Sequence, residues 1–203
     1  MRHSREEVLS KNAQQYPLLR EFVAMKRILN KSIVQVKNLL AVVFLTSPAI
    51  GFSEVSILAL GDSLTQGYGL AQQDGFVPQL NKWLLEQGND VSIINGGVSG
   101  DTSAGGLERV AWALEEDVDI LMVALGGNDL SRGIDPTSTR FYLDQILAIG
   151  TEKGLRLVLI GMSAPNNFGP DYKKEFDAIY PDLAAKYDAT LVDRFMAPLL
   201  DKA

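Results

Sequence analysis

Short apolar runs alternate with amphipathic stretches along the chain from Glu54 onward. The apolar runs end at glycine or polar residues, as buried β-strands do. They predict strands at Val55–Leu60, Val91–Ile94, Ile120–Leu125, Leu155–Ile160 and Ala189–Val192. The continuous run at Ile120–Leu125 is typical of a central strand in a parallel sheet that is covered on both faces.

The stretches between these runs repeat apolar residues at the spacing of one helix face. Four helices are predicted, with the apolar stripes Phe76, Leu80, Trp83 and Leu84; Leu107, Val110, Ala111 and Leu114; Leu143, Ile146 and Leu147; and Tyr172, Phe176, Ile179 and Leu183. Gly88 ends the first helix, Asp101 or Thr102 caps the second, and Asp135-Pro136 begins the third. The alternation predicts an α/β domain, a parallel sheet with helices on both faces. Trp83 and Phe176 are expected in its core and not in a cofactor site.

The first 53 residues follow a different pattern. Residues 1–24 are polar and mixed in charge. From Met25 onward, a cationic stretch precedes the apolar run Leu39–Leu45, and small residues follow near Gly51 and Ser53. This is the order of a secretory signal, and the run is far shorter than the roughly 20 residues of a membrane span. We therefore expect a non-native extension over 1–24, a signal peptide over 25–53 and a periplasmic or secreted protein; the alternative is an amphipathic helix packed on the domain.

Composition narrows the classes of function. The 203 residues suit one domain with a leader, and 46% apolar with 22% charged residues is an ordinary globular balance. A formal net charge of −6 argues against a nucleic-acid partner. With no cysteine and one histidine, disulfides, zinc–thiolate sites and iron–sulfur clusters are excluded or disfavoured. We expect no metal, no cofactor and a monomer.

Three polar motifs each follow a predicted strand. They are Gly61-Asp62-Ser63-Leu64, Ser99-Gly100-Asp101-Thr102-Ser103 and Gly127-Asn128-Asp129. Taken singly, they are ordinary: serine caps helices, and glycine and asparagine form turns. The carboxyl ends of parallel strands share one edge of a sheet, so the three motifs are expected to converge. The Ser63 hydroxyl would then be a nucleophile beside three oxyanion donors, namely the N–H groups of Ser63 and Gly100 and the amide of Asn128.

In order and spacing, these motifs resemble those of the SGNH (GDSL-type) hydrolases, near the thioesterase I, lysophospholipase and arylesterase group, from about Glu54 to the C-terminus. The resemblance implies a three-layer, flavodoxin-like fold with five parallel strands. It also implies that Ser63 accepts the acyl group and that Gly100 and Asn128 form the oxyanion hole. The substrate would be a small-molecule ester, thioester or lysophospholipid. The segment Met162–Tyr172 either lines the acyl groove, as in the resembling thioesterases, or is an ordinary surface loop.

Acidic residues beside the motifs are expected to be structural. We expect Asp62 to be a turn and cap residue, and Asp101 and Asp129 to hold loops through hydrogen bonds to backbone. The family's last block, Asp-x-x-His, has no counterpart: the one histidine is His3, and none of Asp188, Asp193 and Asp201 is followed three residues on by histidine. We therefore expect the domain, residues 54–203, to be truncated before that block and its closing helix, and its activity to be very low.

Two other functions stay open from the sequence. One is a non-catalytic module that binds acyl or acetylated ligands on the same fold. The other is phosphate or flavin binding at the loop Gly61–Gly69, through N–H groups at a helix start. That loop lacks both Gly-x-Gly-x-x-Gly and Gly-Lys-Ser/Thr, which weakens the second alternative.

Overall fold

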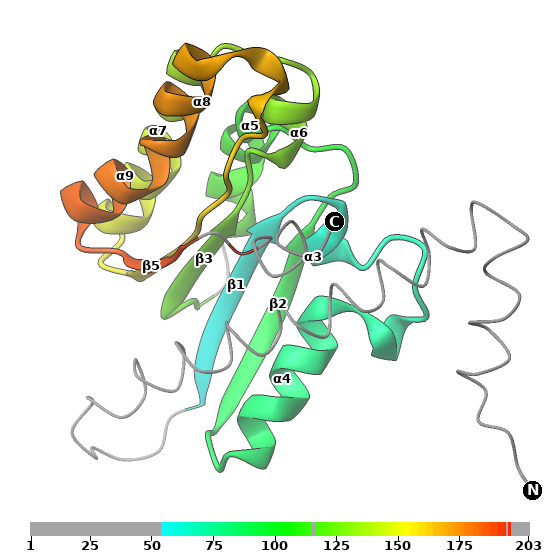
Figure 1. Ribbon diagram of the computed structural model, residues 1–203. Helices are drawn as coiled ribbons and strands as arrows, with labels where there is room; N and C mark the ends of the chain where they lie inside the picture. The colour runs from blue at the N-terminus through cyan, green and yellow to red at the C-terminus, as the bar shows by residue number, and fades with distance from the viewer. Residues whose placement is uncertain (1–53, 115–116, 194, 196–203) are drawn as a thin grey trace, which may run out of the picture.

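The computed structural model describes residues 54–114, 117–193 and 195. The predicted extension and signal peptide, and Asp201, lie outside these residues. The described chain forms one parallel sheet in the order β2-β1-β3-β4-β5 (Figure 1). Its strands are β1 (Val55–Gly61), β2 (Val91–Gly97), β3 (Ile120–Ala124), β4 (Arg156–Ile160) and β5 (Thr190–Val192). All five predicted strands are confirmed, with shifts at their ends.

Helices connect the strands. The α-helices are α3 (Ser63–Gln66), α4 (Phe76–Glu86), α5 (Ser103–Ala113), α6 (Gly127–Ser131), α7 (Pro136–Glu152), α8 (Pro170–Asp177) and α9 (Ile179–Tyr187), and two 3-10 turns are η1 (Gln72–Asp74) and η2 (Asn166–Phe168). The predicted start of α7 is confirmed, because the Asp135 side chain caps the helix and Pro136 is its first residue. Within the described ranges, no helix is both long and apolar enough to cross a membrane.

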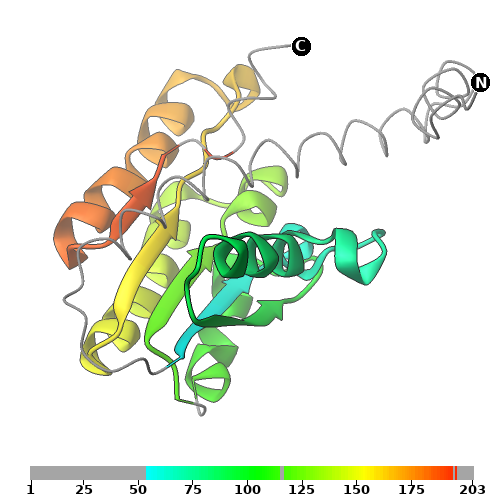
Figure 2. The same cartoon turned by 90° about the horizontal axis from the view of Figure 1, so that it is seen from below.

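The sheet lies between two helical layers (Figures 1 and 2). Alternate strand residues enter opposite cores: Leu58 and Leu60 of β1 pack with α5, α7, α8 and α9, whereas Ile57 and Ala59 pack with α4. Both sets of side chains are 0–1% exposed. The three-layer α/β/α fold with flavodoxin-like strand order is therefore confirmed.

Two details of the predicted helices are wrong. The helix expected through Tyr172 and Leu183 is two helices that meet at Ala178. Pro181 explains the break, since proline cannot donate to the carbonyl four residues back, at Asp177, and its ring crowds that carbonyl.

The face predicted for α5 is also shifted. Ala111 is exposed, and the buried face runs through Ser103, Gly106 and Val110. A Cβ on Gly106 would lie 2.2 Å from the Leu125 side chain, so this small residue lets the helix approach the sheet closely. Of the two expected core aromatics, Phe176 is fully buried. Trp83 is half-buried at the margin of the core beside α4.

The register of the strands places the starts of the three motif loops next to one another. Gly61 at the end of β1 lies beside Gly97 of β2 and Ala124 of β3. The loops that carry the three motifs therefore leave the sheet side by side at its carboxyl edge, where open α/β sheets bind ligands.

Candidate active site

The first motif forms a tight turn from β1 into α3. Asp62 is the N-cap residue, and its Oδ1 accepts a hydrogen bond of 3.0 Å from the Leu64 N–H. Ser63 is the first residue of α3 and is half-buried. Its backbone N–H belongs to the first turn, where N–H groups have no partner within the helix. The predicted role of Asp62 as a cap is confirmed.

Glycine is required at position 61 for this turn to form. A Cβ there would lie 2.0 Å from the Thr65 hydroxyl oxygen, in the first turn of the helix. Gly61 therefore lets α3 fold back onto the end of its own strand, which places Ser63 at the sheet edge.

The second motif is the loop between β2 and α5. Gly100 has a φ of +82°, a conformation that glycine adopts without strain. Its carbonyl oxygen accepts a hydrogen bond of 2.7 Å from Nη2 of Arg132, which follows α6. Of the two predicted caps of α5, the structure shows Thr102, whose Oγ1 accepts from the Gly105 N–H at 3.3 Å.

The third motif follows β3 through a turn at Gly126, whose φ is +110°. The hydroxyl of Tyr180, a buried residue of α9, donates to the Leu125 carbonyl at 3.0 Å, immediately before this turn. A Cβ on Gly126 would lie 2.1 Å from that hydroxyl. The turn leads into α6, of which Asn128 is the second residue.

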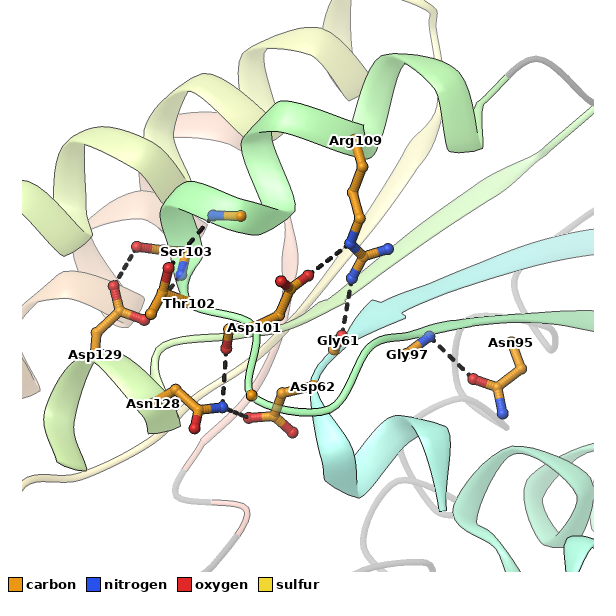
Figure 3. Close-up of polar contacts among 12 residues, drawn as sticks. Gly61, Asp62, Asn95, Gly97, Asp101, Thr102, Ser103, Arg109, Asn128 and Asp129 are labelled. Carbon is orange, nitrogen blue, oxygen red and sulfur yellow. Dashed lines mark hydrogen bonds and ion pairs between the residues drawn. The ribbon is translucent and has the colours of Figure 1, made fainter. Parts of the chain in front are cut away.

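Asn128 joins the three motifs (Figure 3). Its Nδ2 donates to Oδ2 of Asp62 at 3.2 Å and to the carbonyl oxygen of Asp101 at 2.9 Å. Asp62 precedes Ser63 in the chain and Asp101 follows Gly100, so the structure brings the predicted nucleophile and oxyanion donors to one place. Two acceptors occupy the two hydrogens of the Asn128 amide.

The carboxyl group of Asp62 lies in this junction, and the residue as a whole is 4% exposed. Burial raises its pKa above the ordinary value; the hydrogen bond from the Leu64 N–H opposes this rise, and the negative charge of Asp101 adds to it. The contact between Asp62 and Asn128 went unpredicted, because capping alone accounts for an aspartate at this position.

Arg109 of α5 forms a second connection that the sequence analysis missed (Figure 3). Its Nε donates to Oδ2 of Asp101 at 2.6 Å, and its Nη2 donates to the Gly61 carbonyl at 2.9 Å. The prediction that the Asp101 side chain holds backbone is therefore wrong: its carboxylate pairs with Arg109, and its carbonyl oxygen binds Asn128. The available signal was an arginine eight residues, about two helical turns, after Asp101.

Asp129 holds the second motif to the third, as predicted. It is 1% exposed, and its Oδ2 accepts from the Ser103 N–H at 2.8 Å. Its Oδ1 accepts from the hydroxyls of Ser103 and Thr139. Three donors from α5 and α7 thus surround one buried carboxylate, which ties both helices to α6.

The segment Met162–Tyr172 follows β4 and borders the same edge of the sheet. Lys173 anchors it, since its Nζ donates to the Ala164 carbonyl at 2.5 Å and to Oδ2 of Asp177 at 2.7 Å. On the other side, the Tyr172 hydroxyl donates to the Ile134 carbonyl at 2.8 Å. The segment is therefore held against the loop after α6, and its part in acyl binding stays a prediction.

No group of acidic residues among the described residues is arranged to hold a metal ion.

Comparisons with known proteins agree with this geometry. The sequence model of the GDSL-like Lipase/Acylhydrolase family matches residues 59–202. "Esterase TesA" of Pseudomonas aeruginosa is 36% identical over 158 residues, which is 77% of this chain and 77% of that protein. "Thioesterase 1/protease 1/lysophospholipase L1" of Escherichia coli K12 is 37% identical over 143 residues, 70% of this chain and 67% of that protein.

A solved structure is similar as well. The crystal structure of AlinE4, described as an SGNH-hydrolase family esterase, has a TM-score of 0.71 and 43% sequence identity, and the match covers 76% of this chain and 82% of that one. The family match spans well over half of this chain and includes all three motifs. The chain therefore belongs to the GDSL-like lipase/acylhydrolase family.

Proposed function

We propose that this protein is a serine hydrolase of carboxylic esters or thioesters, in which the Ser63 hydroxyl receives the acyl group. The observation that carries the proposal is the junction at Asn128, which holds the Ser63 turn and the Gly100 loop together at the carboxyl edge of the sheet. The names of the relatives, an esterase and a thioesterase/lysophospholipase, support the same class of reaction.

The proposed reaction uses groups of all three motifs. A base takes the Ser63 proton while Oγ attacks the substrate carbonyl carbon. The carbonyl oxygen becomes an oxyanion, which accepts hydrogen bonds from the N–H groups of Ser63 and Gly100 and from Nδ2 of Asn128. Collapse of this intermediate expels the alcohol or thiol, which takes up a proton, and water then releases the acid from the serine.

Asn128 has to change partners in this reaction. Since two acceptors occupy its amide hydrogens, one contact must open when the oxyanion forms. The contact with Asp62, at 3.2 Å, is longer than the contact with Asp101, at 2.9 Å. We therefore propose that Asn128 gives up Asp62 and keeps Asp101.

The reaction requires a base that takes the proton of Ser63. Its one histidine is His3, and no aspartate is followed three residues on by histidine. Without a base, Ser63 is a neutral alcohol of low nucleophilicity near neutral pH. Removing the serine or histidine of a comparable triad lowers turnover about a million-fold, with ~10³–10⁴ over water remaining from the oxyanion hole and binding. We propose that the 203-residue chain hydrolyses esters barely above background.

A non-catalytic module for acyl or acetylated ligands is the second candidate. It is favoured by one observation, namely that both amide hydrogens of Asn128 already have acceptors within the protein. In that case, adding a base would not produce turnover that depends on Ser63.

The two candidates are separated by hydrolysis of short p-nitrophenyl esters. The 203-residue chain is compared with the same chain extended by the family's Asp-x-x-His segment and terminal helix. We expect the extension to raise turnover, Ser63→Ala to abolish the gain, and Ser138→Ala, in the first turn of α7, to leave it unchanged. An extended, folded chain that gains no turnover would favour the binding module, and a gain that survives Ser63→Ala would exclude Ser63 as the nucleophile.

We also propose export, with residues 25–53 as a signal peptide. The proposal is supported by the order of the cationic stretch from Lys26 and the apolar run Leu39–Leu45. Expressed from Met25 in a bacterium with a periplasm, the protein should appear there, shortened near Gly51 or Ser53. Recovery of an uncleaved protein from the cytoplasm would reject the proposal.

A further inference from the structure

A backbone hydrogen bond of 3.0 Å from the Val98 N–H to the Gly61 carbonyl joins the Gly100 loop to the Ser63 turn. Two side-chain bridges also cross the gap between them (Figure 3). Asn128 makes one, between the Asp62 carboxylate and the Asp101 carbonyl. Arg109 makes the other, between the Gly61 carbonyl and the Asp101 carboxylate. The two bridges share Asp101 and end on adjacent residues of the turn, so together they close a ring of hydrogen bonds between the turn and the loop.

The Arg109 bridge is built from charged groups that are largely removed from water. The side chains of Arg109 and Asp101 are 20% and 17% exposed. Charge-assisted hydrogen bonds are roughly twice as strong as neutral ones, and two bonds from one rigid guanidinium fix the positions of both acceptors. The Asn128 bridge has one uncharged donor atom, Nδ2, which lies 3.2 Å from the Asp62 carboxylate and 2.9 Å from the Asp101 carbonyl oxygen.

Gly105, in the first turn of α5, provides the space that the Asp101 carboxylate occupies. A Cβ on Gly105 would lie 2.5 Å from Oδ1 of Asp101, so any larger residue there would displace the carboxylate that Arg109 binds. Glycine is a poor helix former, about 1 kcal/mol less favourable than alanine, and space for the Asp101 carboxylate gives a reason for it at this position.

The proposed reaction opens the Asn128 bridge and leaves the Arg109 bridge intact. Asn128 has to release an acceptor when it binds the oxyanion, so its bridge is weakened in that step. The same step requires the N–H groups of Ser63 and Gly100 to be correctly spaced. Arg109 points toward Asp101 and Gly61 and is not required to move. Its bridge can therefore keep the Ser63 and Gly100 N–H groups in place throughout the reaction.

We propose that Arg109 is a positioning residue, which holds the Ser63 turn and the Gly100 loop at a fixed spacing while Asn128 turns from Asp62 to the oxyanion. The proposal rests on the function proposed above and adds a residue that acts through Asp101 and not on the substrate. It also states what Arg109 does in the free protein: it holds Asp101, and so the carbonyl that Asn128 binds.

Two variants break the Arg109 bridge by different routes. Arg109→Lys keeps the charge, but a single ammonium cannot reproduce the paired geometry of the guanidinium. Gly105→Ala pushes the Asp101 carboxylate aside while it favours the helix, so it tests the bridge even where Arg109→Lys fails to fold. The matched control is Arg140→Lys, because Arg140 also pairs with an aspartate, Asp182, through Nη2 at 2.9 Å, but between α7 and α9.

The measurement is the side-chain amide signal of Asn128 in ¹⁵N–¹H spectra of the full 203-residue chain, assigned by its loss in Asn128→Ala. In Arg109→Lys and Gly105→Ala we expect the signal to shift and its hydrogens to exchange with solvent about tenfold faster, as for a lost hydrogen bond. In Arg140→Lys both properties should match the wild type. A folded Gly105→Ala or Arg109→Lys protein with the wild-type signal and exchange rate would overturn the proposal, as would an equal change in Arg140→Lys. Because no turnover is measured, this outcome is separate from the test of Ser63.

Discussion

The Tyr180 hydroxyl tests how the core of the protein supports the Asn128 turn. Tyr180→Phe removes one oxygen and leaves the ring, which packs edge-on against Phe176 with centroids 5.9 Å apart. The lost contact is the hydrogen bond of 3.0 Å to the Leu125 carbonyl. Both residues are essentially buried, at 1% and 0% exposed, so water cannot easily replace the hydroxyl.

A buried carbonyl left without its donor destabilises a protein by about 1–3 kcal/mol. For a chain of this size, each kcal/mol lowers the melting temperature by roughly 2–4 °C, so Tyr180→Phe should lower it by roughly 2–12 °C. In a form with turnover, kcat should fall more than KM rises, because the Leu125 carbonyl precedes the turn that presents Asn128. Thermal unfolding followed by circular dichroism, with steady-state kinetics, gives both quantities.

Tyr187→Phe is the matched control, since Tyr187 lies on the same helix. Its hydroxyl donates to Oδ1 of Asp144 at 3.0 Å, but Asp144 also pairs with Lys186 and is reached by water. We expect a smaller loss of stability and no change in kcat. Equal losses in the two variants, or a Tyr180→Phe protein as stable as the wild type, would show that the Tyr180 hydroxyl does not support the Asn128 turn.

Three further outcomes are expected. In an enzyme with measurable turnover, Asn128→Ala should lower kcat by ~10²–10³, as for loss of one oxyanion donor; an unchanged kcat would remove Asn128 from the oxyanion hole. In the same enzyme, Arg109→Lys should lower kcat by up to about 10²-fold through displaced donors, and a change in KM alone would argue for a role in binding. Burial raises the pKa of Asp62 in the folded protein, so the folded state binds the proton of this group more tightly than the unfolded state does. The free energy of unfolding that Asp62 contributes therefore falls as pH rises from near 3.8 through the raised folded pKa. Melting temperatures against pH should therefore decline relative to Asp62→Asn over that window, and parallel curves would contradict the assigned pKa direction.

Local patterns predicted the fold and the convergence of the three motifs. The apolar run at Ile120–Leu125 and the cap at Asp135-Pro136 depend on neighbours in the sequence, and both are confirmed. The convergence of the three motifs follows from parallel strands that share a carboxyl edge, which requires no side-chain detail. The break between α8 and α9 could also have been predicted, since Pro181 lies within the predicted helix. The apolar spacing on both sides of Pro181 favoured a single continuous helix instead.

The contacts that hold the site together were not predictable in the same way. Arg109 and Gly61 are 48 residues apart, and Tyr180 and Leu125 are 55 residues apart. Such pairs depend on how helices pack across the sheet, and a lone arginine or tyrosine in a helical pattern indicates only a surface or core position. The buried face of α5 was predicted wrongly because it depends on the same packing. Ser103 and Gly106 are buried by the close approach of the helix to the sheet and not by apolar character.

Locating the acyl group on the protein tests most directly whether Ser63 is the nucleophile. The chain extended by the Asp-x-x-His segment is mixed with p-nitrophenyl acetate, quenched in acid and mapped by peptide mass spectrometry, beside its Ser63→Ala variant and the 203-residue chain. We predict an acetyl group on Ser63 in the extended chain, none in Ser63→Ala, and far slower labelling of the 203-residue chain. Acetylation of another residue at the rate of turnover, or turnover that persists in Ser63→Ala, would contradict the proposal that Ser63 is the nucleophile.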